Sequence, residues 1–256
     1  MSYPFPIEHY DQVLTDWIKP GSVSDKPLLS PALQQAQFEH FKERLMYPWS
    51  EQNVIQIKTF DLKADEEAQL VEYGKNIGRM SCDAASPNFN VPYPAAWIEN
   101  LRAQVNLSQF EGKNSTQGKG IALDNLPMRI LPTEDRYFHD CNLPGEGDSF
   151  DYLQMTALWA GTPVYILGES VDHNWYLVRS SDAMAWVKSA GIKKVSDDFV
   201  TAWSKAASQS LVAINGPINT ETLFIFDETT HSKLFSGFIG AVFPVDRFSK
   251  PIQTYQ

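Results

Sequence analysis

Residues 164–187 read VYILGESVDHNWYLVRSSDAMAWV, and this stretch decides the fold class. Its apolar runs at 164–167, 175–178 and 185–187 are three or four residues long, and polar segments rich in Gly, Ser, Asp and Asn separate them. Short apolar runs joined by tight polar turns are typical of antiparallel strands in a small barrel or sandwich. The sequence therefore predicts a small all-β unit here.

The sequence upstream of this unit predicts helices. The Ser-Pro pair at 30–31 combines a favoured N-cap with the residue favoured at the first helical position. Two further helices are expected over 64–80 and from residue 94 onward, and the prolines within 1–29 predict an extended arm. The positions expected to face inward are Phe38, Phe41 and Leu45 in the first helix, Leu70, Tyr73, Ile77 and Met80 in the second, and Trp97, Ile98, Leu101 and Val105 in the third.

The sequence downstream of the all-β unit predicts one more helix and a second set of strands. Ser196 is a favoured N-cap, and the acidic pair that follows it suits the positive end of the helix dipole. Strands are then expected at 211–214, 222–226 and 238–243, with a turn at 215–217. The Gly/Ser/Asn-rich stretch 111–120, before the all-β unit, is expected to be a loop.

Composition excludes several classes of partner. The 256 residues carry 21 Lys and Arg against 31 Asp and Glu, a formal net charge of −10, which repels nucleic acid and anionic membranes. No apolar stretch approaches the ~20 residues that span a bilayer, so no membrane span is expected. The first ten residues lack the basic and apolar regions of a signal peptide. The two cysteines leave the redox compartment open.

A more specific pattern lies in one block of the chain, which contains Leu131-Pro132-Thr133, Phe138, Asp140, Pro144-Gly145-Glu146-Gly147, Phe150-Asp151-Tyr152-Leu153-Gln154, Gly161-Thr162-Pro163-Val164, Ser170, Asp172, Trp175 and Trp186-Val187. This block resembles the first bacterial SH3-like (SH3b) domain of the NlpC/p60 group of murein peptidases. An upstream set resembles the helical N-terminal domain that precedes this barrel in multi-domain members: Leu28-Leu29-Ser30, Phe41 and Tyr47-Pro48-Trp49.

The resemblance implies an α+β fold in which a helical N-terminal domain is followed by two small SH3-like β barrels. The expected parts are an extended N-terminal arm at 1–29, the helical domain at 30–122, the first barrel at 123–195, and a linking helix with the second barrel at 196–256. We expect the helical domain and the first barrel to share an apolar interface, because residues 111–120 are too few for a long tether.

The resemblance also implies a function. In that family the barrels precede a papain-like catalytic domain that cleaves the stem peptide of peptidoglycan. The present chain ends at Gln256, where that domain is expected to begin, so the parent is expected to be a γ-D-glutamyl murein endopeptidase and the chain its targeting and substrate-framing region. The alternative is a stand-alone murein-binding or protein-interaction module without enzymatic activity. The residues alone leave open a cytosolic protein or an exported one whose signal peptide has been removed. The resemblance implies a periplasmic or extracellular location, with the signal peptide absent from this sequence.

The run FDYLQ at 150–154 is the strongest candidate for a ligand site. By the resemblance, the first barrel lends acidic and aromatic side chains to the substrate cleft. Asp151 or Gln154 is then expected to hold the free amine of a trimmed stem peptide, with Tyr152 or Trp159 as a stacking wall. The alternative is that the run is an ordinary barrel strand with alternate residues on opposite faces.

Other candidate chemistry is weaker. Asp140-Cys141 begins like the nucleophile motif of the family, but Asn142-Leu143-Pro144 follows in place of Ser-Gly, and proline prevents the helix that lowers a thiol pKa. Cys141 is expected to be a loop cysteine or half of a disulfide with Cys82. The five histidines show no metal-ligand spacing, so no metal and no cofactor are predicted. Two tryptophans, at 175 and 186, are expected in the core.

Overall fold

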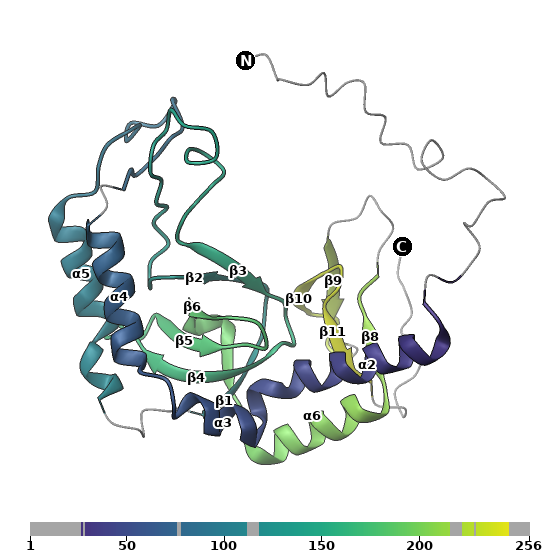
Figure 1. The fold of residues 1–256 in the computed structure, drawn as a ribbon. Helices are drawn as coiled ribbons and strands as arrows, with labels where there is room; N and C mark the ends of the chain where they lie inside the picture. The colour runs from purple at the N-terminus through teal and green to yellow at the C-terminus, as the bar shows by residue number, and fades with distance from the viewer. Residues whose placement is uncertain are drawn as a thin grey trace, which may run out of the picture. The chain divides into compact units, whose positions relative to one another are not determined.

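The computed structural model describes residues 27, 29–75, 78–111, 118–215, 222–227 and 229–245 (Figure 1). The chain divides into two compact units, residues 1–41 and 42–256. Most of the expected arm at 1–29 and most of the expected turn at 215–217 lie outside the described residues. Among the residues that are described, no helix is long and apolar enough to cross a membrane.

Helix α2 (Pro31–Met46) begins where the sequence predicts it. The Oγ atom of Ser30 accepts a hydrogen bond from the backbone N–H of Leu33 at 3.3 Å, as an N-cap does. Phe38 and Phe41, which were expected to face inward, are exposed, and no other residue of α2 is buried either. Helical spacing of apolar residues therefore predicted the helix correctly and its buried face wrongly.

The described residues of the second unit contain seven further helical segments. Helix α3 was not predicted, and α4 ends at Lys75, earlier than the predicted end at Met80. Helix α5 follows Pro94 and α6 follows Ser196, as expected. The segments are η2 (Tyr47–Trp49), α3 (Glu51–Ile57), α4 (Leu62–Lys75), α5 (Ala95–Val105), η3 (Leu107–Phe110), η4 (Ser189–Gly191) and α6 (Asp197–Gln209).

Seven strands of the second unit form one antiparallel sheet in the order β3-β2-β6-β5-β4-β1-β7. The strands are β1 (Gly118–Ala122), β2 (Leu126–Arg129), β3 (Gln154–Leu158), β4 (Pro163–Glu169), β5 (Trp175–Arg179), β6 (Met184–Lys188) and β7 (Ile192–Lys194). The three apolar runs of 164–187 thus lie in β4, β5 and β6, as predicted. Strand β1 corrects one expectation. Residues 111–120 were expected to be a loop of the helical domain, but residues from Gly118 onward pair with β4.

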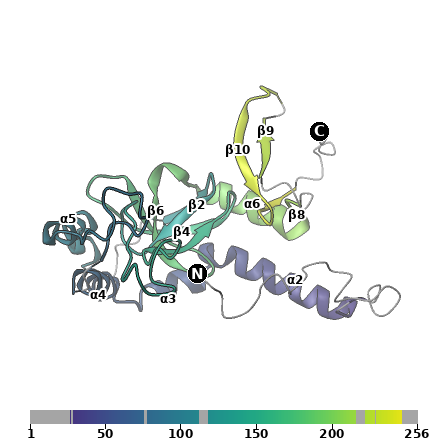
Figure 2. The same cartoon turned by 90° about the horizontal axis from the view of Figure 1, so that it is seen from above.

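The helices α4 and α5 lie beside this sheet and share its core (Figures 1 and 2). The buried side chains that make up this core include Leu70, Leu101 and Val105 from the helices, and Leu167, Trp175, Leu177 and Trp186 from the strands. The expected apolar interface between the helices and the sheet is therefore present. A separate apolar cluster, which includes Met128, Val164, Ile166, Val178 and Val187, fills another part of the sheet.

Two tryptophan indoles join helices to the sheet through hydrogen bonds. The Nε1–H of Trp49, in η2, donates to the carbonyl oxygens of Gly120 at 3.0 Å and Val164 at 3.1 Å. The Nε1–H of Trp186, in β6, donates to Oε2 of Glu66, in α4, at 2.8 Å. These bonds satisfy both indole donors inside the core, as buried tryptophans require.

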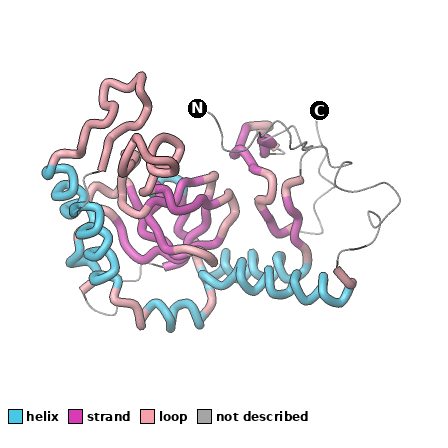
Figure 3. Tube along the Cα trace, turned by 45° about the horizontal axis from the view of Figure 1, so that its top comes forward, coloured by secondary structure: helices cyan, strands magenta, loops and turns pink. Residues whose placement is uncertain are grey.

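Long loops at 79–94 and 130–153 are joined to one another (Figure 3, pink). Cys82 and Cys141 form a disulfide with a Cα–Cα distance of 5.1 Å and a sequence separation of 59. In the chain-entropy account, closing a loop of that length stabilises the fold by about 4 kcal/mol. Backbone hydrogen bonds between Arg79 and Phe138 in both directions, at 2.7 and 3.1 Å, add a second connection beside the disulfide.

The C-terminal part of the second unit contains α6 and two small sheets. Strand β8 (Leu211–Ala213) pairs with β11 (Val242–Pro244), and β9 (Thr222–Phe226) pairs with β10 (Lys233–Phe238). The predicted strand at 238–243 is wrong, because a turn at 239–240 separates β10 from β11. In the residues described between 196 and 245, the sheets are two-stranded, so a second SH3-like barrel is not confirmed and stays a prediction.

Glu66 is a buried carboxyl group between α4 and β6. Its pKa is raised from 4.5 to about 7, because burial disfavours the charged form and the hydrogen bond from Trp186 offsets this only in part. The folded state therefore retains a proton that the unfolded chain releases above pH ~4.5. The contribution of Glu66 to stability is present in full below pH 4.5 and is lost as the pH rises through about 7.

We expect Glu66→Gln to flatten this pH dependence. Between pH 4.5 and 8 the wild-type chain should lose about 3 kcal/mol that the variant does not lose, since each pKa unit corresponds to ~1.4 kcal/mol. Urea unfolding of both proteins at several pH values measures the difference. Glu67→Gln, at the neighbouring exposed position, is the matched control. A wild-type curve that parallels the Glu66→Gln curve across this range would contradict the assignment.

Candidate functional site

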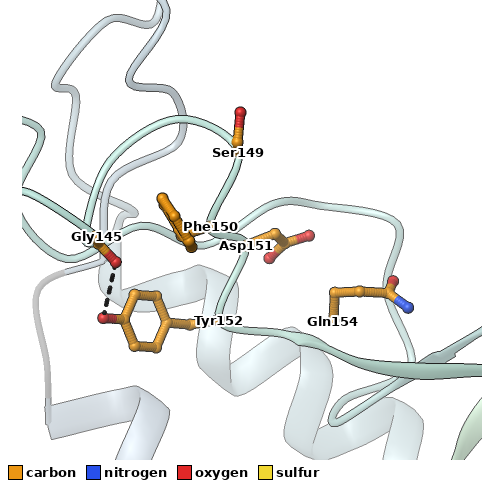
Figure 4. Close-up of a pocket in the computed structure, with 6 residues that line it drawn as sticks. All are labelled: Gly145, Ser149, Phe150, Asp151, Tyr152 and Gln154. Carbon is orange, nitrogen blue, oxygen red and sulfur yellow. Dashed lines mark hydrogen bonds between the residues drawn. The ribbon is translucent and has the colours of Figure 1, made fainter. Parts of the chain in front are cut away.

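The candidate site is a pocket of about 560 Å³ beside the start of β3. Figure 4 shows the six residues that line it, which we call the 150-loop pocket: Gly145, Ser149, Phe150, Asp151, Tyr152 and Gln154. Three of the four residues predicted for the site therefore lie together. The predicted alternative of a strand over 150–154 is wrong, since only Gln154 belongs to β3 and residues 150–153 form a turn-containing loop.

The loop is held by a buried ion pair between Arg129, the last residue of β2, and Asp151. The Nη1 atom of Arg129 lies 2.5 Å from Oδ2 of Asp151, and the two side chains are 7% and 11% exposed. The same Nη1 atom lies 3.3 Å from Oε1 of Gln154, and Nε donates to the Thr133 carbonyl at 3.1 Å. The Nη2 atom donates to the carbonyl of Asp135. One guanidinium therefore holds together the segment 133–135, Asp151 of the loop and Gln154 at the start of β3.

The carboxylate of Asp151 is occupied by the protein itself. Its Oδ1 atom accepts hydrogen bonds from the backbone N–H groups of Tyr137 and Leu153, each at 3.0 Å, and Oδ2 accepts from Arg129. These bonds use three of the roughly four acceptor sites of a carboxylate, and the charge of Arg129 balances its own. Asp151 is therefore placed to shape the pocket. The sequence analysis expected either Asp151 or Gln154 to hold a ligand amine, and of these two Gln154 is the exposed one.

Tyr152 forms an aromatic wall of the pocket and is half-buried. Its ring packs edge-on against His139, with centroids 4.0 Å apart, and its hydroxyl lies 3.5 Å from the Gly145 carbonyl (Figure 4). The backbone carbonyl of Tyr152 accepts a hydrogen bond from the Tyr73 hydroxyl at 2.9 Å, which ties the loop to α4. The ring is thus held from two sides.

Phe150 and Ser149 complete the open side of the pocket. Phe150 is 56% exposed, which is unusual for a large apolar side chain and leaves it free to contact a ligand. Ser149 has a φ of 77°, a left-handed conformation that is uncommon for a residue with a side chain. Backbone strain of this kind persists where surrounding contacts fix the chain, and it is often found at binding sites.

Trp159 lies away from the other three predicted residues. It follows the last residue of β3, whereas Gln154 is the first, so roughly 16 Å of strand separates them. Trp159 is 43% exposed and belongs to the turn 159–162. At Gly161 in that turn φ is 82°, and an added Cβ would lie 2.5 Å from the ring of Phe243 in β11. The structure therefore places Trp159 outside the 150-loop pocket, in a turn whose Gly161 lies close to β11.

The cysteine and histidine candidates have structural roles. Cys141 is bonded to Cys82, so the half-disulfide alternative holds and neither thiol is free. His173 lies 3.0 Å from Glu169 on an exposed turn. Among the described residues, no group of three or more His, Cys, Asp or Glu side chains is placed to hold a metal ion.

Sequence reasoning missed Arg129, which organises the site. The signal was present, because Arg129 stands between Met128 and Ile130 at the end of an apolar strand, and a charged residue in that setting needs a buried partner. What the sequence did not show is that its partner is Asp151, which lies 22 positions away.

Comparisons with known proteins agree with this fold. Residues 136–188 match the family model of the SH3 domain of SH3b1 type, a range that contains all six residues that line the 150-loop pocket but not Arg129, which holds the loop. The chain therefore carries an SH3b domain, as predicted.

The fold of the chain is also similar to that of an NlpC/P60 endopeptidase from Photobacterium damselae subsp. piscicida, with a TM-score of 0.69 and 21% identity. The match covers 87% of this chain and 48% of that protein, so the chain spans about half the length of the endopeptidase. Among curated proteins, no sequence matches the chain.

Two Asp-to-Ala substitutions in the same loop should differ sharply in their effect on stability. We expect Asp151→Ala to cost about 3–5 kcal/mol, because it leaves a buried guanidinium without its negative partner and two backbone N–H groups without an acceptor. The control is Asp148→Ala, which breaks an ion pair with Arg136 in which both side chains are 50% exposed, and should cost less than about 1 kcal/mol. Urea unfolding measures both, and equal losses would contradict this account of the loop.

Proposed function

We propose that the chain is the targeting and substrate-framing region of a cell-wall cysteine peptidase, and that its ligand is the stem peptide of peptidoglycan. Two findings support this proposal: the SH3b1-type match over 136–188 and a fold shared with an NlpC/P60 endopeptidase. The papain-like catalytic domain is a proposed partner that adjoins the C-terminal side of the chain. A periplasmic or extracellular location is part of the same proposal, and the disulfide is compatible with it.

The observation that carries the proposal is the 150-loop pocket itself. An exposed Phe150, a half-buried Tyr152 and the Gln154 amide line one open pocket within the SH3b-matching part of the chain. An apolar wall suits the short aliphatic side chain of a stem peptide, and the primary amide matches a peptide bond, which also has one donor and one acceptor side.

The charge around the pocket supports a cationic end on the ligand. Residues 133–151 contain six acidic side chains, and Arg129, Arg136 and Lys188 form ion pairs with three of them, so three negative charges are in excess. Such an excess of negative charge attracts an ammonium group, such as the free amine of a trimmed stem peptide. With Asp151 committed to Arg129, we assign the attraction to the field of the whole loop and the contacts to Phe150, Tyr152 and Gln154.

An open pocket of this kind gives weak binding by itself. Most of the surface of a bound peptide stays in contact with water unless a second wall covers it. In this proposal the catalytic domain supplies that wall, so the chain frames the substrate and the enzyme completes the cleft. The alternative function, a stand-alone murein-binding or protein-interaction module, needs the same pocket but no second wall.

We expect the purified chain to bind L-Ala-γ-D-Glu-diaminopimelate with a Kd on the order of millimolar. NMR titration measures this affinity through backbone shifts at 145–154. Phe150→Ala should weaken binding about tenfold through loss of an apolar contact, whereas Trp159→Ala, which removes an exposed aromatic ring outside the pocket, should leave the affinity unchanged. Shifts that cluster around Trp159, or an unchanged affinity of Phe150→Ala, would contradict the proposed site.

We expect the chain alone to hydrolyse none of this peptide in the presence of a thiol reductant. Cysteine peptidase chemistry needs a thiolate, a base within hydrogen-bond distance and an oxyanion donor held together. Both cysteines here are joined in a disulfide, and once it is reduced neither is followed by the Ser-Gly of the nucleophile motif. Product analysis by mass spectrometry measures turnover. Hydrolysis that disappears in Cys141→Ala would show that the chain is an enzyme by itself. Hydrolysis that requires an added NlpC/P60 catalytic domain, and that this chain accelerates, would favour the framing role over the stand-alone module.

A further inference from the structure

A second pocket, of about 460 Å³, is lined by the loop 79–94, the first turns of α5 and the segment 135–136. It shares no lining residue with the 150-loop pocket. We call it the Trp97 pocket, and six of its lining residues carry its chemistry: Asn88, Tyr93, Trp97, Asn100, Asp135 and Arg136. Its volume is within the range of small-molecule sites, roughly 300–1,000 Å³.

Two stacked aromatic rings form one wall of the Trp97 pocket. The centroids of the Tyr93 and Trp97 rings are 4.3 Å apart, with an interplanar angle of 24°. The Tyr93 hydroxyl donates to the Arg136 carbonyl at 2.6 Å, which holds this ring in place. Both residues are half-buried, so part of each ring faces solvent. The electron-rich faces of such rings attract a cation.

Asp135 brings a negative charge that the protein itself leaves unbalanced. Its Oδ2 atom accepts a hydrogen bond from the indole N–H of Trp97 at 2.8 Å, and the residue is exposed. Among the described residues, no Lys, Arg or His side chain forms an ion pair with Asp135, whereas Asp148 and Asp151 of the same loop each have such a partner. The charge of Asp135 is therefore available to a ligand.

The positive charge of Arg136, which also lines the pocket, is engaged elsewhere. Its Nη2 atom lies 3.1 Å from Oδ1 of Asp148. Its guanidinium carbon lies 4.8 Å from the centroid of the Phe138 ring, which does not line the pocket. Arg136 therefore does not cancel the charge of Asp135.

The pKa of the Tyr93 hydroxyl reports the same negative charge. Burial raises this pKa most, the charges of Asp135 and Asp151 raise it further, and the charge of Arg129 lowers it. Since Asp151 and Arg129 form an ion pair with each other, Asp135 is the charge that remains at the pocket. The field here is negative, in keeping with the acidic excess of the whole loop 133–151.

We infer that the Trp97 pocket binds a guanidinium group, the head of an arginine side chain. A guanidinium is planar, always charged and weakly hydrated, so it stacks on aromatic rings and pairs with a carboxylate. Its five N–H donors need acceptors, and the side-chain oxygens of Asp135, Asn88 and Asn100 provide them. An ammonium group matches less well, because it is compact and strongly hydrated. Free arginine and an arginine of a protein partner share this chemistry.

The guanidinium site does not depend on the proposed function. The stem peptide L-Ala-γ-D-Glu-diaminopimelate carries ammonium groups but no guanidinium, and its proposed contacts lie in the 150-loop pocket. A probe that carries a guanidinium and no stem peptide therefore tests the Trp97 pocket alone. Its failure would leave the proposed binding of the stem peptide unaffected.

The test titrates N-acetyl-L-arginine amide into the full chain and follows the Trp97 indole N–H resonance by NMR. We expect a saturable shift of this resonance, which Trp97→Phe identifies by its loss, with a Kd on the order of millimolar. N-acetyl-L-citrulline amide, a neutral analogue of the same shape, should bind about tenfold more weakly. Equal affinities for the two probes, or shifts that gather at 145–154, would overturn the inference.

Two further probes identify the source of the guanidinium. N-acetyl-L-lysine amide carries the same charge on an ammonium and should bind more weakly than the arginine probe, whereas tighter binding of the lysine probe would contradict a guanidinium site. Free L-arginine separates the two sources. A lower Kd for free arginine than for the blocked amide favours the amino acid as ligand, and a higher Kd favours an arginine within a protein.

Matched variants locate the binding, measured by isothermal titration calorimetry. Asp135→Asn should weaken binding of the arginine probe about tenfold, because it removes the charge but keeps an oxygen for the Trp97 indole. The control, Glu99→Gln in α5, changes the net charge equally but lies outside the pocket, 3.9 Å from Arg102, and should leave the affinity unchanged. Because Asp135 is exposed, its substitution preserves the fold even if Trp97→Phe proves unstable. Equal affinities of the two variants would overturn the inference.

Discussion

The guanidinium of Arg129 is the constraint on which the candidate sites depend. Its hydrogen bonds reach Thr133, Asp135, Asp151 and Gln154, so a single side chain at the end of β2 fixes both ends of the loop 133–151. A buried arginine is tolerated only when its donors are satisfied, and here four acceptors surround it. The loop therefore cannot move far without exposing a buried charge, so side-chain hydrogen bonds hold in place a long segment that has no regular secondary structure.

A second constraint keeps the helices and the sheet together. The indole N–H groups of Trp49 and Trp186 each find an acceptor on an element distant in sequence, and the apolar core continues across the same contacts. An SH3-like sheet is small, and a small sheet has difficulty burying enough apolar surface by itself. Covering one part of it with α4 and α5 provides the missing burial. This arrangement requires a buried carboxyl group, because the Trp186 indole donates to Glu66. Burial raises the pKa of Glu66 to about 7.

The sequence was informative wherever local rules decide the structure. The strands β4, β5 and β6 followed from short apolar runs, and the starts of α2 and α6 followed from Ser30 and Ser196. Local rules gave the wrong prediction where pairing between segments distant in sequence determines the structure. The stretch that contains Gly118 and Gly120 has the composition of a loop, yet it pairs with β4 because Trp49 and Ile192 cover it.

The candidate site shows the same division. Asp151, Tyr152 and Gln154 were found because a resemblance marked the block that contains them, and the structure places them in one pocket. The roles of these residues could not be predicted from the sequence. Whether Asp151 can bind a ligand depends on whether a cation of the protein already pairs with it, and here Arg129 does. Arg129 lies 22 positions upstream, and no spacing rule joins a strand end to a loop at that distance. Trp159 does not line this pocket, because the residues of β3, Gln154–Leu158, separate it from the loop.

The same arginine connects distant parts of the loop 130–153. Arg129 donates to the carbonyl of Asp135 and to the side chain of Asp151, which lines the 150-loop pocket. The disulfide at Cys141 joins the middle of the same loop to Cys82. A change of shape on binding needs an element with two arrangements of similar free energy, and a loop held at both ends and in the middle has little freedom to provide one. We therefore expect the 150-loop pocket to keep the same shape with and without a ligand.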